Sequence, residues 1–515
     1  MKRYWSIKLL VYLSFLVLLA GVLRLGWIRG GYYRQQARDN KVTETLILAD
    51  RGQIVDRKGR VLVRSQEVDG IKRRQYLYGE ALGAVTGYVG KADGGELKYG
   101  VCGGRKLNNL SLVGRGGIEE SMDCQLLGTD GKKLTEVDAK GRLVRELGTY
   151  AAVAGKEVEL SIDAYWQEKM FKLLAGKKAA AAVSEAGTGK ILVMTSSPSF
   201  DPNVFAYEPD SSKIKNYLED KNGLPMMNRV VGAKYHPGSV FKLAVATAGL
   251  EEGVINESTT FEDTGVIKVG EYSYSNWLWT KRGTTDGMVD IVKGIKRSND
   301  IFFYRLGETL GSEKIKKWAT KFGMGVKTGV EIPAEVEGLV PDARWKEKNS
   351  GEKWFLGNTY HLVIGQGEVS VSPLQINLET SVIANGGRKC QMSILKNSEI
   401  KCEDLGISSK TINLIKTGMI GACQNGGTAW PLFNFKTKLA CKTGTAEVGD
   451  GTKDTHAWLT AFAPADNPQI IITVLVERGG EGSDIAAPIV GDFLKEWFEE
   501  PNTVVPRYST AAVGE

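Results

Sequence analysis

Apolar residues are spread unevenly along this chain, and the longest apolar run lies near its start. From Ile7 to Ile28 the only charged residues are Lys8 and Arg24, close to the two ends. A run of this length can cross a bilayer as one helix, and both basic side chains can reach the interface. A cleaved signal peptide is the alternative, but no clear small-x-small cleavage site is present. We therefore expect a cytoplasmic tail at residues 1–6, an uncleaved transmembrane helix at residues 7–28, and export of the long remainder.

The pattern changes after the apolar run. Residues 29–157 are rich in Gly, Lys and short strand-like runs and lack a long periodic helix, which predicts a small β-rich pedestal module. The next part has strands first, helices in the middle and strands last, which predicts one sheet that closes around a helical insert, an α+β fold, over residues 158–500. Its strands are expected at 158–163, 180–183, 191–194, 439–445, 457–463 and 470–477, and its helices at 165–174, within 288–421 and at 487–499. Residues 501–515 are expected to form a disordered tail.

Composition narrows the class of protein. With 515 residues, of which 42% are hydrophobic and 25% charged, the chain can form a large core. The net charge of +7 is spread thinly, without the basic runs of a nucleic-acid-binding protein, so no nucleic acid is expected as a partner. Six cysteines in an exported chain permit disulfides: Cys390 could pair with Cys402 and Cys423 with Cys441, while Cys102, Cys124 and all the others could equally be buried thiols. There is no Cys-x-x-Cys and the three histidines lack ligand spacing, so no metal site is expected.

The first candidate for chemistry is Ser239. Pro237 and Gly238 interrupt the chain just before it, and a run of good helix formers follows, so Ser239 is expected in the first turn of a buried helix. Lys242 lies three residues on, which places both side chains on one face. The helix dipole and apolar surroundings disfavour an ammonium, so Lys242 could accept the serine proton. Ser-x-x-Lys also occurs without a preceding Pro-Gly or a following apolar helix, at Ser212, Ser350, Ser393 and Ser398.

The second candidate is the triplet Ser298-Asn299-Asp300, between a helical stretch and an apolar helix. Ser, Asn and Asp are preferred at helix N-caps, so a purely structural role is the alternative for this triplet.

The third candidate is Lys442-Thr443-Gly444-Thr445, which closes a strand. The glycine leaves room for another backbone, and the hydroxyls and the lysine could hold a carboxylate. Two other Lys-Thr-Gly triplets, starting at Lys327 and Lys416, lie in a turn and in a helical run, where neither can present a strand edge.

Taken in this order, Ser239-x-x-Lys242, Ser298-x-Asp300 and Lys442-Thr443-Gly444 resemble the signature of penicillin-binding proteins and serine β-lactamases. Additional segments resemble the class B penicillin-binding proteins, which are monofunctional peptidoglycan transpeptidases: Arg51 to Gly59, Gly117 to Glu119, Pro198 to Asn203, Ile364 to Gly367, Ser372 to Gln375 and His456 to Trp458. Two features depart from that pattern. Asp300 stands where many relatives have Asn, and the pedestal is short, because Tyr76 follows soon after Val63.

The resemblance implies a β-lactamase/transpeptidase-like domain: an antiparallel sheet with helices on both faces and a helical subdomain. It implies a stem peptide ending in D-Ala-D-Ala as substrate, with Ser239 forming the acyl-enzyme and Lys242 as base. Ser298 would relay a proton to the leaving D-Ala, and Asp300 would bind Lys242 and the peptide backbone. The terminal carboxylate would be held by Lys442, Thr443 and Thr445, and the backbone N–H groups of Ser239 and Thr445 would form the oxyanion hole. No metal or organic cofactor is implied.

The resemblance also implies a place in the cell and a set of partners. The chain would be a single-pass membrane protein with its catalytic domain outside the cytoplasm, and it would bind peptidoglycan stem peptides and β-lactam antibiotics. Its protein partner would be a multi-spanning glycan polymerase of the shape, elongation, division and sporulation family. A D,D-carboxypeptidase, a β-lactam sensor and a β-lactamase remain the alternatives.

Overall fold

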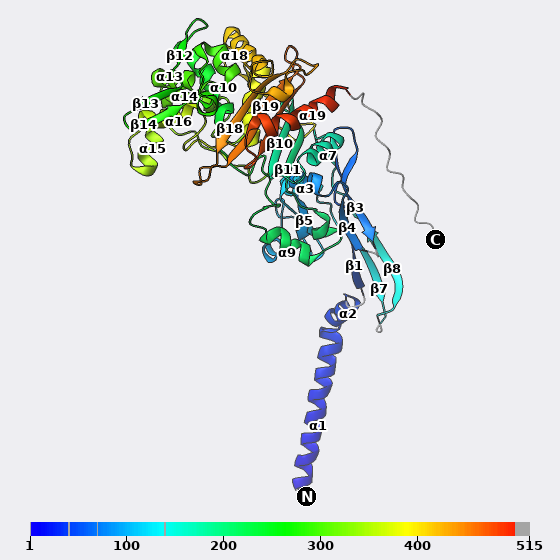
Figure 1. Ribbon diagram of the computed structural model, residues 1–515. Helices are drawn as coiled ribbons and strands as arrows, with labels where there is room; N and C mark the ends of the chain where they lie inside the picture. The colour runs from blue at the N-terminus through cyan, green and yellow to red at the C-terminus, as the bar shows by residue number, and fades with distance from the viewer. Residues whose placement is uncertain (1, 40–41, 69–70, 139–140, 500–515) are drawn as a thin grey trace. The chain divides into compact units, whose positions relative to one another are not determined.

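The computed structural model describes residues 2–39, 42–68, 71–138 and 141–499 (Figure 1). The tail expected at residues 501–515 lies outside the described residues. The contacts divide the chain into two compact units: Met1–Gly52 with Leu127–Lys156, and Gln53–Leu126 with Glu157–Glu515. Residues 29–157 are thus shared between the two units, and the domain boundaries given by the sequence stay predictions.

The first unit contains the apolar helix and a small sheet. Helix α1 (Lys2–Leu23) continues through a π-helical turn, Arg24–Ile28, and α2 (Gly30–Asp39) follows. Residues Tyr4–Ile28 are long and apolar enough to span a membrane, and none of the side chains in their apolar window is buried. The sheet is antiparallel, in the order β1-β7-β8: β1 (Val42–Ile47), β7 (Gly131–Val137) and β8 (Leu143–Tyr150).

The second unit is built around a five-stranded antiparallel sheet, in the order β11-β10-β20-β19-β18. Its strands are β10 (Ala179–Glu185), β11 (Ile191–Ser197), β18 (Ala440–Glu447), β19 (Thr455–Ala463) and β20 (Ile470–Val476). The strands expected from the sequence at 180–183, 191–194, 439–445, 457–463 and 470–477 are therefore found, and distant parts of the chain meet in one sheet. The strand expected at 158–163 is only partly correct, because it is limited to β9 (Val158–Glu159), which belongs to another sheet.

Helices cover both faces of this sheet. Successive side chains of a strand point to opposite faces, and nearly all of them are buried here, so each face needs a covering layer. One face packs on α7 (Ala164–Leu173) and α19 (Ala487–Glu499), which Figure 1 shows beside the strands. The other face packs on α10 (Lys242–Glu251) and α17 (Pro373–Ala384). The predicted α+β fold with helices on both faces is confirmed.

The helical subdomain and its small strands lie between β11 and β18 in the chain. They comprise α8 (Asn203–Ala206), α9 (Ser211–Glu219), the 3-10 turn η2 (Gly238–Phe241), β12 (Phe261–Asp263), β13 (Val266–Val269), β14 (Tyr272–Ser275), α11 (Trp277–Arg282), β15 (Gly287–Val289), α12 (Ile291–Arg297), α13 (Asp300–Leu310), α14 (Ser312–Lys321), α15 (Ala343–Ser350), α16 (Leu356–Val363), β16 (Arg388–Cys390), β17 (Cys402–Asp404), α18 (Ser409–Ala422) and η3 (Trp430–Leu432). The turn η4 (Gly482–Ala486) joins β20 to α19.

Residues 53–126 add a second, smaller layer to this unit. Its sheet has the order β4-β3-β2-β9: β2 (Ile54–Val55), β3 (Val61–Val68), β4 (Ile71–Tyr76) and β9 (Val158–Glu159). A hairpin and four short helices complete it: β5 (Tyr88–Lys91), β6 (Leu112–Arg115), α3 (Glu80–Thr86), α4 (Gly94–Tyr99), α5 (Gly117–Ser121) and α6 (Asp123–Leu126). A fully buried ion pair, Arg74 Nε to Glu119 Oε1 at 2.7 Å, ties β4 to α5.

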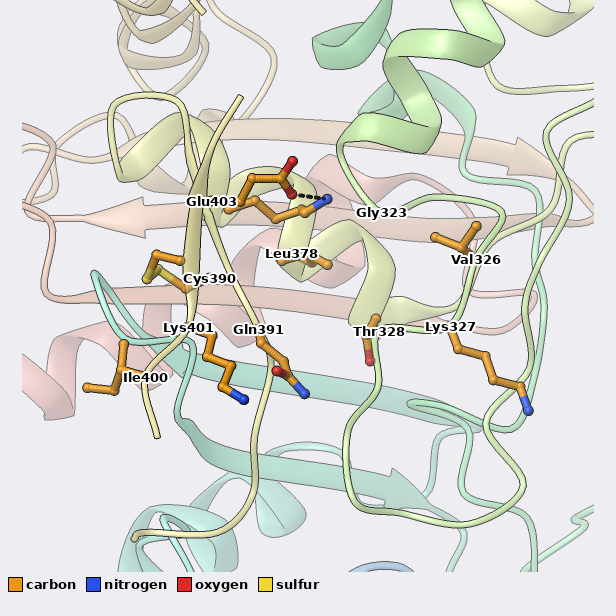
Figure 2. Close-up of a pocket in the computed structure, with 12 residues that line it drawn as sticks. Gly323, Val326, Lys327, Thr328, Leu378, Cys390, Gln391, Ile400, Lys401 and Glu403 are labelled. Atoms are coloured by element: carbon orange, nitrogen blue, oxygen red, sulfur yellow. Dashed lines mark ion pairs between the residues drawn. A yellow bond between two sulfur atoms is a disulfide. The ribbon is translucent and has the colours of Figure 1, made fainter. Parts of the chain in front are cut away.

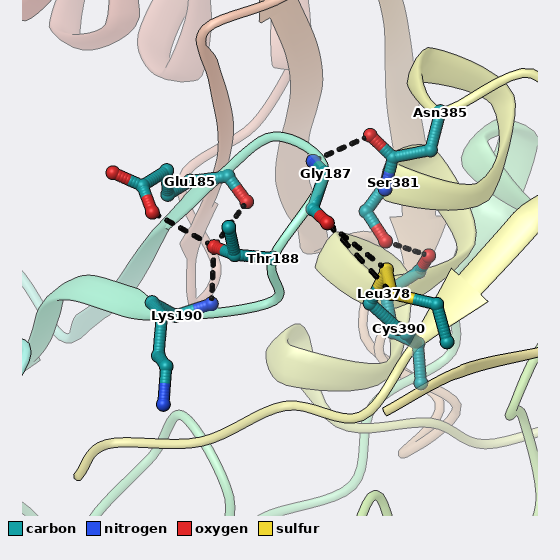
Figure 3. The surroundings of a disulfide bond; sticks show 9 residues. Glu185, Gly187, Thr188, Lys190, Leu378, Ser381, Asn385 and Cys390 are labelled. Carbon is teal, nitrogen blue, oxygen red and sulfur yellow. Dashed lines mark hydrogen bonds between the residues drawn. A yellow bond between two sulfur atoms is a disulfide. The ribbon is translucent and has the colours of Figure 1, made fainter. Parts of the chain in front are cut away.

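All six cysteines are paired, as Cys102–Cys124, Cys390–Cys402 and Cys423–Cys441. The second pair joins β16 to β17, where the two residues face each other in register. This hairpin borders a cavity of about 570 Å³, whose lining also includes Leu378 and Lys401 (Figure 2). Gly187 O lies 3.4 Å from Cys390 Sγ (Figure 3), and since the oxidised sulfur carries no proton this is a close contact without a donated hydrogen.

Candidate active site

Ser239 lies in the 3-10 turn η2, directly before α10, so the α-helix begins three residues later than the sequence predicts. Tight turns of this kind are frequent at helix N-termini. The turn is held by Gly238, whose N–H donates to Gly365 O at 2.9 Å and whose φ is +57°. A Cβ on Gly238 would lie 2.7 Å from Thr445 O, so the turn passes directly against strand β18. Ser239 itself is half-buried, between buried neighbours.

Lys242 is fully buried and points at the triplet that begins at Ser298. Its Nζ donates to Asp300 Oδ1 at 2.6 Å and to Ser298 O at 2.9 Å. Burial lowers the pKa of Lys242, and the Asp300 carboxylate opposes that shift. Among the described residues no hydrogen bond joins Ser239 Oγ to Lys242 Nζ. Such bonds are often long before a ligand is bound, and the two groups still lie one turn apart at the same helix start.

In the triplet Ser298-Asn299-Asp300, one residue caps a helix and the other two contact the buried lysines. Asn299 is the N-cap of α13, because its Oδ1 accepts from Phe302 N at 2.9 Å. Its neighbours Ser298 and Asp300 face the buried lysines instead. Ser298 has a left-handed φ of +54° at the end of α12, and Asp300 Oδ2 accepts the Trp277 N–H at 3.0 Å. The capping interpretation therefore holds for the middle residue alone.

Lys442 completes the cluster from strand β18. Its Nζ donates to Ser298 Oγ at 2.8 Å and to Thr443 O at 2.9 Å, and the side chain is fully buried. Burial, and then the charge of Lys242, hold the pKa of Lys442 well below its ordinary value. Ser298 Oγ also lies 3.4 Å from Lys242 Nζ. One hydroxyl thus bridges two amines, and within the described part of the chain no acceptor takes its own proton.

The remaining residues of β18 form the wall beside this cluster. Thr443 Oγ1 donates to Thr428 Oγ1 at 2.7 Å, and Thr445 Oγ1 donates to Glu481 Oε2 at 3.1 Å. A Cβ on Gly444 would lie 3.1 Å from Pro237 O, which agrees with the expectation that the glycine permits close approach of another backbone.

Two buried or bridging carboxylates at the site have no counterpart in the sequence prediction. Glu379 of α17 is fully buried, and its Oε1 accepts the N–H of Ala244 in the first turn of α10. Burial raises the pKa of Glu379 well above its ordinary value. Glu481 pairs with Lys281 of α11 at 2.7 Å. Neither residue belongs to a recognisable motif, so only the contacts reveal them.

Comparisons with known proteins show the family to which the chain belongs. A model of the penicillin-binding protein transpeptidase domain matches residues 179–495, and a model of the penicillin-binding protein dimerisation domain matches residues 67–160. The peptidoglycan D,D-transpeptidase MrdA of Escherichia coli is 32% identical over 480 residues, covering 86% of this chain and 74% of that protein. Its namesake in Haemophilus influenzae is 31% identical over 475 residues, covering 86% and 72%.

Solved structures give the same result. The penicillin-binding protein PBP2 of Pseudomonas aeruginosa in complex with WCK 5153 has a TM-score of 0.78 at 31% identity, covering 91% of this chain and 100% of that chain. PBP2 of Helicobacter pylori in complex with MreC has a TM-score of 0.79 at 28% identity, covering 88% and 98%. A chain from a peptidoglycan synthase complex has a TM-score of 0.80 at 26% identity, covering 98% and 99%. The resemblance seen in the sequence is confirmed, and this chain belongs to the penicillin-binding protein transpeptidase family.

Proposed function

We propose that Ser239 is the nucleophile with which this chain forms its acyl-enzyme, and that Lys242, Ser298 and Lys442 carry the protons. The chain is a peptidoglycan D,D-transpeptidase, a serine-type acyltransferase of cell-wall synthesis. The observation that carries the residue assignment is the Ser298 hydroxyl, which lies 2.8 Å from Lys442 Nζ and 3.4 Å from Lys242 Nζ. Three motifs far apart in the chain meet at that one atom.

In the acylation step, Ser239 Oγ attacks the carbonyl carbon of the penultimate D-Ala of a donor stem peptide. Lys242 accepts the serine proton, for which its amine must first be neutral, and its burial favours that form. The N–H groups of Ser239 and Thr445 stabilise the oxyanion. Ser298 passes its proton to the leaving nitrogen and takes one from the protonated Lys242, whose Nζ lies 3.4 Å from Ser298 Oγ; the C–N bond breaks and D-Ala departs. An amine of a second peptide then attacks the ester and gives up one proton; the C–O bond to Ser239 breaks, the amide cross-link forms, and Ser239 takes up that proton.

The two buried lysines favour these proton transfers, because a charge on one amine raises the free-energy cost of protonating the other. With one carboxylate, Asp300, bound to Lys242, the cluster is suited to hold fewer than two ammonium groups. Burial, and then the charge of Lys242, lower the pKa of Lys442, and no carboxylate lies within 4 Å of its amine among the described residues. It acts through Ser298 and, with Thr443 and Thr445, at the terminal carboxylate.

We also propose the place and the partners. The helix at Tyr4–Ile28 anchors the chain as a single span, with the catalytic unit outside the cytoplasm. The similar chain from a peptidoglycan synthase complex supports a glycan polymerase of the shape, elongation, division and sporulation family as partner. Stem peptides and β-lactam antibiotics are the ligands of Ser239.

The test is labelling with a fluorescent penicillin, followed by mass spectrometry of the labelled peptide. Ser239→Ala should abolish labelling, and the wild-type adduct should map to the peptide that carries Ser239. Ser212→Ala is the matched control, because Ser212 starts another Ser-x-x-Lys but is exposed and bonds to Asp210. Labelling that persists in Ser239→Ala, or disappears in Ser212→Ala, would contradict the assignment. Product analysis with an amine acceptor separates cross-linking from the release of free acid by a carboxypeptidase.

A further inference from the structure

An internal carboxylate lies on the hydroxyl to which a ligand carboxylate is assigned. Glu481 Oε2 accepts the Thr445 hydroxyl at 3.1 Å, and Glu481 Oε1 lies 2.7 Å from Lys281 Nζ. The N–H of Gly482 approaches Thr445 Oγ1 at 3.4 Å, so the hydroxyl has a donor on one side and gives its own proton to Glu481. Thr445 therefore has no free proton for a second carboxylate.

The pair of donors around Glu481 defines a carboxylate position. A hydroxyl from strand β18 and an ammonium from helix α11 converge on the two oxygens of one carboxyl group, an arrangement that binds carboxylates through charge-assisted hydrogen bonds. The basic residue nearest to Glu481 in sequence, Arg478, is not its ion-pair partner. Arg478 is instead bound to Asp450 and Asp454 in the loop between β18 and β19. The contact with Lys281 thus depends on the fold and not on local sequence.

We propose that Glu481 occupies the position of the donor's terminal carboxylate in the ligand-free chain, and that Lys281 is a further substrate-binding residue, which receives that carboxylate when Glu481 leaves. The inference rests on the proposed function through the role given to Thr445. The exchange conserves charge at the site, because one carboxylate replaces another on the same two donors.

The exposure of the pair suits such an exchange. The side chains of Lys281 and Glu481 are 47% and 37% exposed, and ion pairs as exposed as this are weak. A released Glu481 side chain is already at the surface, so its charge regains water without a cost of burial. Buried pairs, such as Lys242 with Asp300, lack this freedom.

The consequence is a preference among ligands. A donor peptide or penicillin with a free carboxylate gains Lys281 and Thr445 together and displaces Glu481. An ester or amide of the same molecule gains neither the ion pair nor the displacement. Selectivity for the free acid over the ester should therefore depend on Lys281. The rate at which the free acid acylates the chain should be limited by Glu481, which the ligand must displace.

The experiment uses the full chain in detergent and measures the second-order rate constant of acylation by benzylpenicillin and by its methyl ester, each in competition with a fluorescent penicillin. In Glu481→Gln the constant for the acid should rise by about 3-fold to 30-fold, because the exposed ion pair is lost and the hydrogen bond from Thr445 is weakened from one to a charged acceptor to one to a neutral amide oxygen. The constant for the ester should change little. In the double variant with Lys281→Gln the gain for the acid should be lost. Asp466→Asn, which removes an exposed ion pair with Lys438 away from this site, is the control and should leave both constants unchanged.

Three results would overturn the proposal: an acid constant that stays the same or falls in Glu481→Gln, an equal rise for acid and ester, or a gain that survives the addition of Lys281→Gln. Melting temperatures of all variants check that the fold is retained. The Ser239→Ala chain separates this inference from the proposed function. If it no longer labels while Glu481→Gln fails to accelerate the acid, only the role of Glu481 and Lys281 falls.

Discussion

Replacing Asp300 by Asn removes one charge from the buried lysine cluster and keeps the shape of the side chain. Asp300 uses both carboxylate oxygens: Oδ1 accepts from Lys242 Nζ at 2.6 Å and Oδ2 accepts from the Trp277 N–H at 3.0 Å. Asparagine has one oxygen and an amide that can only donate. While Lys242 is protonated, one of the two bonds must therefore be replaced by a meeting of two donors.

The size of the effect follows from these contacts. Breaking a buried ion pair costs about 3–5 kcal/mol when the remaining charge stays buried and unpaired. Lys242 can avoid that state by losing its proton, because the pKa of Lys242 is already lowered by burial and only the Asp300 charge opposes the shift. The remaining cost is one hydrogen bond to a charged group and one unpaired donor, so we expect a loss of about 2–4 kcal/mol in the free energy of unfolding.

The pH dependence has a definite sign. A lysine whose pKa is lower in the folded than in the unfolded state stabilises the fold less as pH falls, because the unfolded chain binds more protons. The deficit of Asp300→Asn should therefore be larger at pH 6 than at pH 9. The acidic limb of the acylation rate should move to lower pH, since the amine stays neutral there. The plateau should fall by about 10-fold or more, because the base is weaker and less well held.

The assays are thermal denaturation and time courses of labelling by a fluorescent penicillin from pH 5 to pH 9.5. Asp286→Asn is the matched control: the Asp286 side chain is only 7% exposed, but its ion-pair partner is Arg297, at 2.9 Å. It should lower stability without moving the acidic limb. An acidic limb that does not move in Asp300→Asn, or that moves to higher pH, would refute the account of Lys242.

Three further changes test other parts of the site. Gly365→Ala should lower acylation by about 100-fold or more, since its φ is +73° and a Cβ would lie 2.2 Å from Gly238 O; a rate within a few-fold of wild type would contradict this. Burial lowers the pKa of His456 to about 4, so wild type should lose about 3 kcal/mol of stability between pH 6.5 and 4 through this residue. His456→Gln should lack that loss when unfolding by denaturant is measured at the two pH values. Burial raises the pKa of Glu379, so wild type should lose stability as pH rises. Glu379→Gln keeps an acceptor for the Ala244 N–H, so its stability relative to wild type should be higher at pH 9 than at pH 5. Equal pH profiles of stability for the two proteins would contradict this.

The sequence predicts the frame of the site well and its secondary contacts poorly. Local sequence patterns indicate three of the site residues. Ser239 follows a helix breaker and precedes an apolar helix, Ser298 belongs to a polar triplet between helices, and Lys442 lies beside a glycine in a strand. Glu379 lies inside a helix whose buried residues run all round it, so no periodicity distinguishes its carboxyl from a surface glutamate. Glu481 follows two glycines in a loop, and its partner is 200 residues away, a pairing that only the fold creates.

The place of β10 in the sheet has a consequence for how the chain reaches its native state. Residues Ala179–Glu185 pair on one side with the nearby strand β11, but on the other side with β20 at Ile470–Val476. The hairpin is thus made early in synthesis, while its second neighbour is among the last segments to emerge. Contacts of such separation form slowly and leave apolar strand surface open for longer. A chain that stops short of Ile470 would lack the middle strand of its sheet, so we expect such truncations to aggregate and not to yield a smaller active domain.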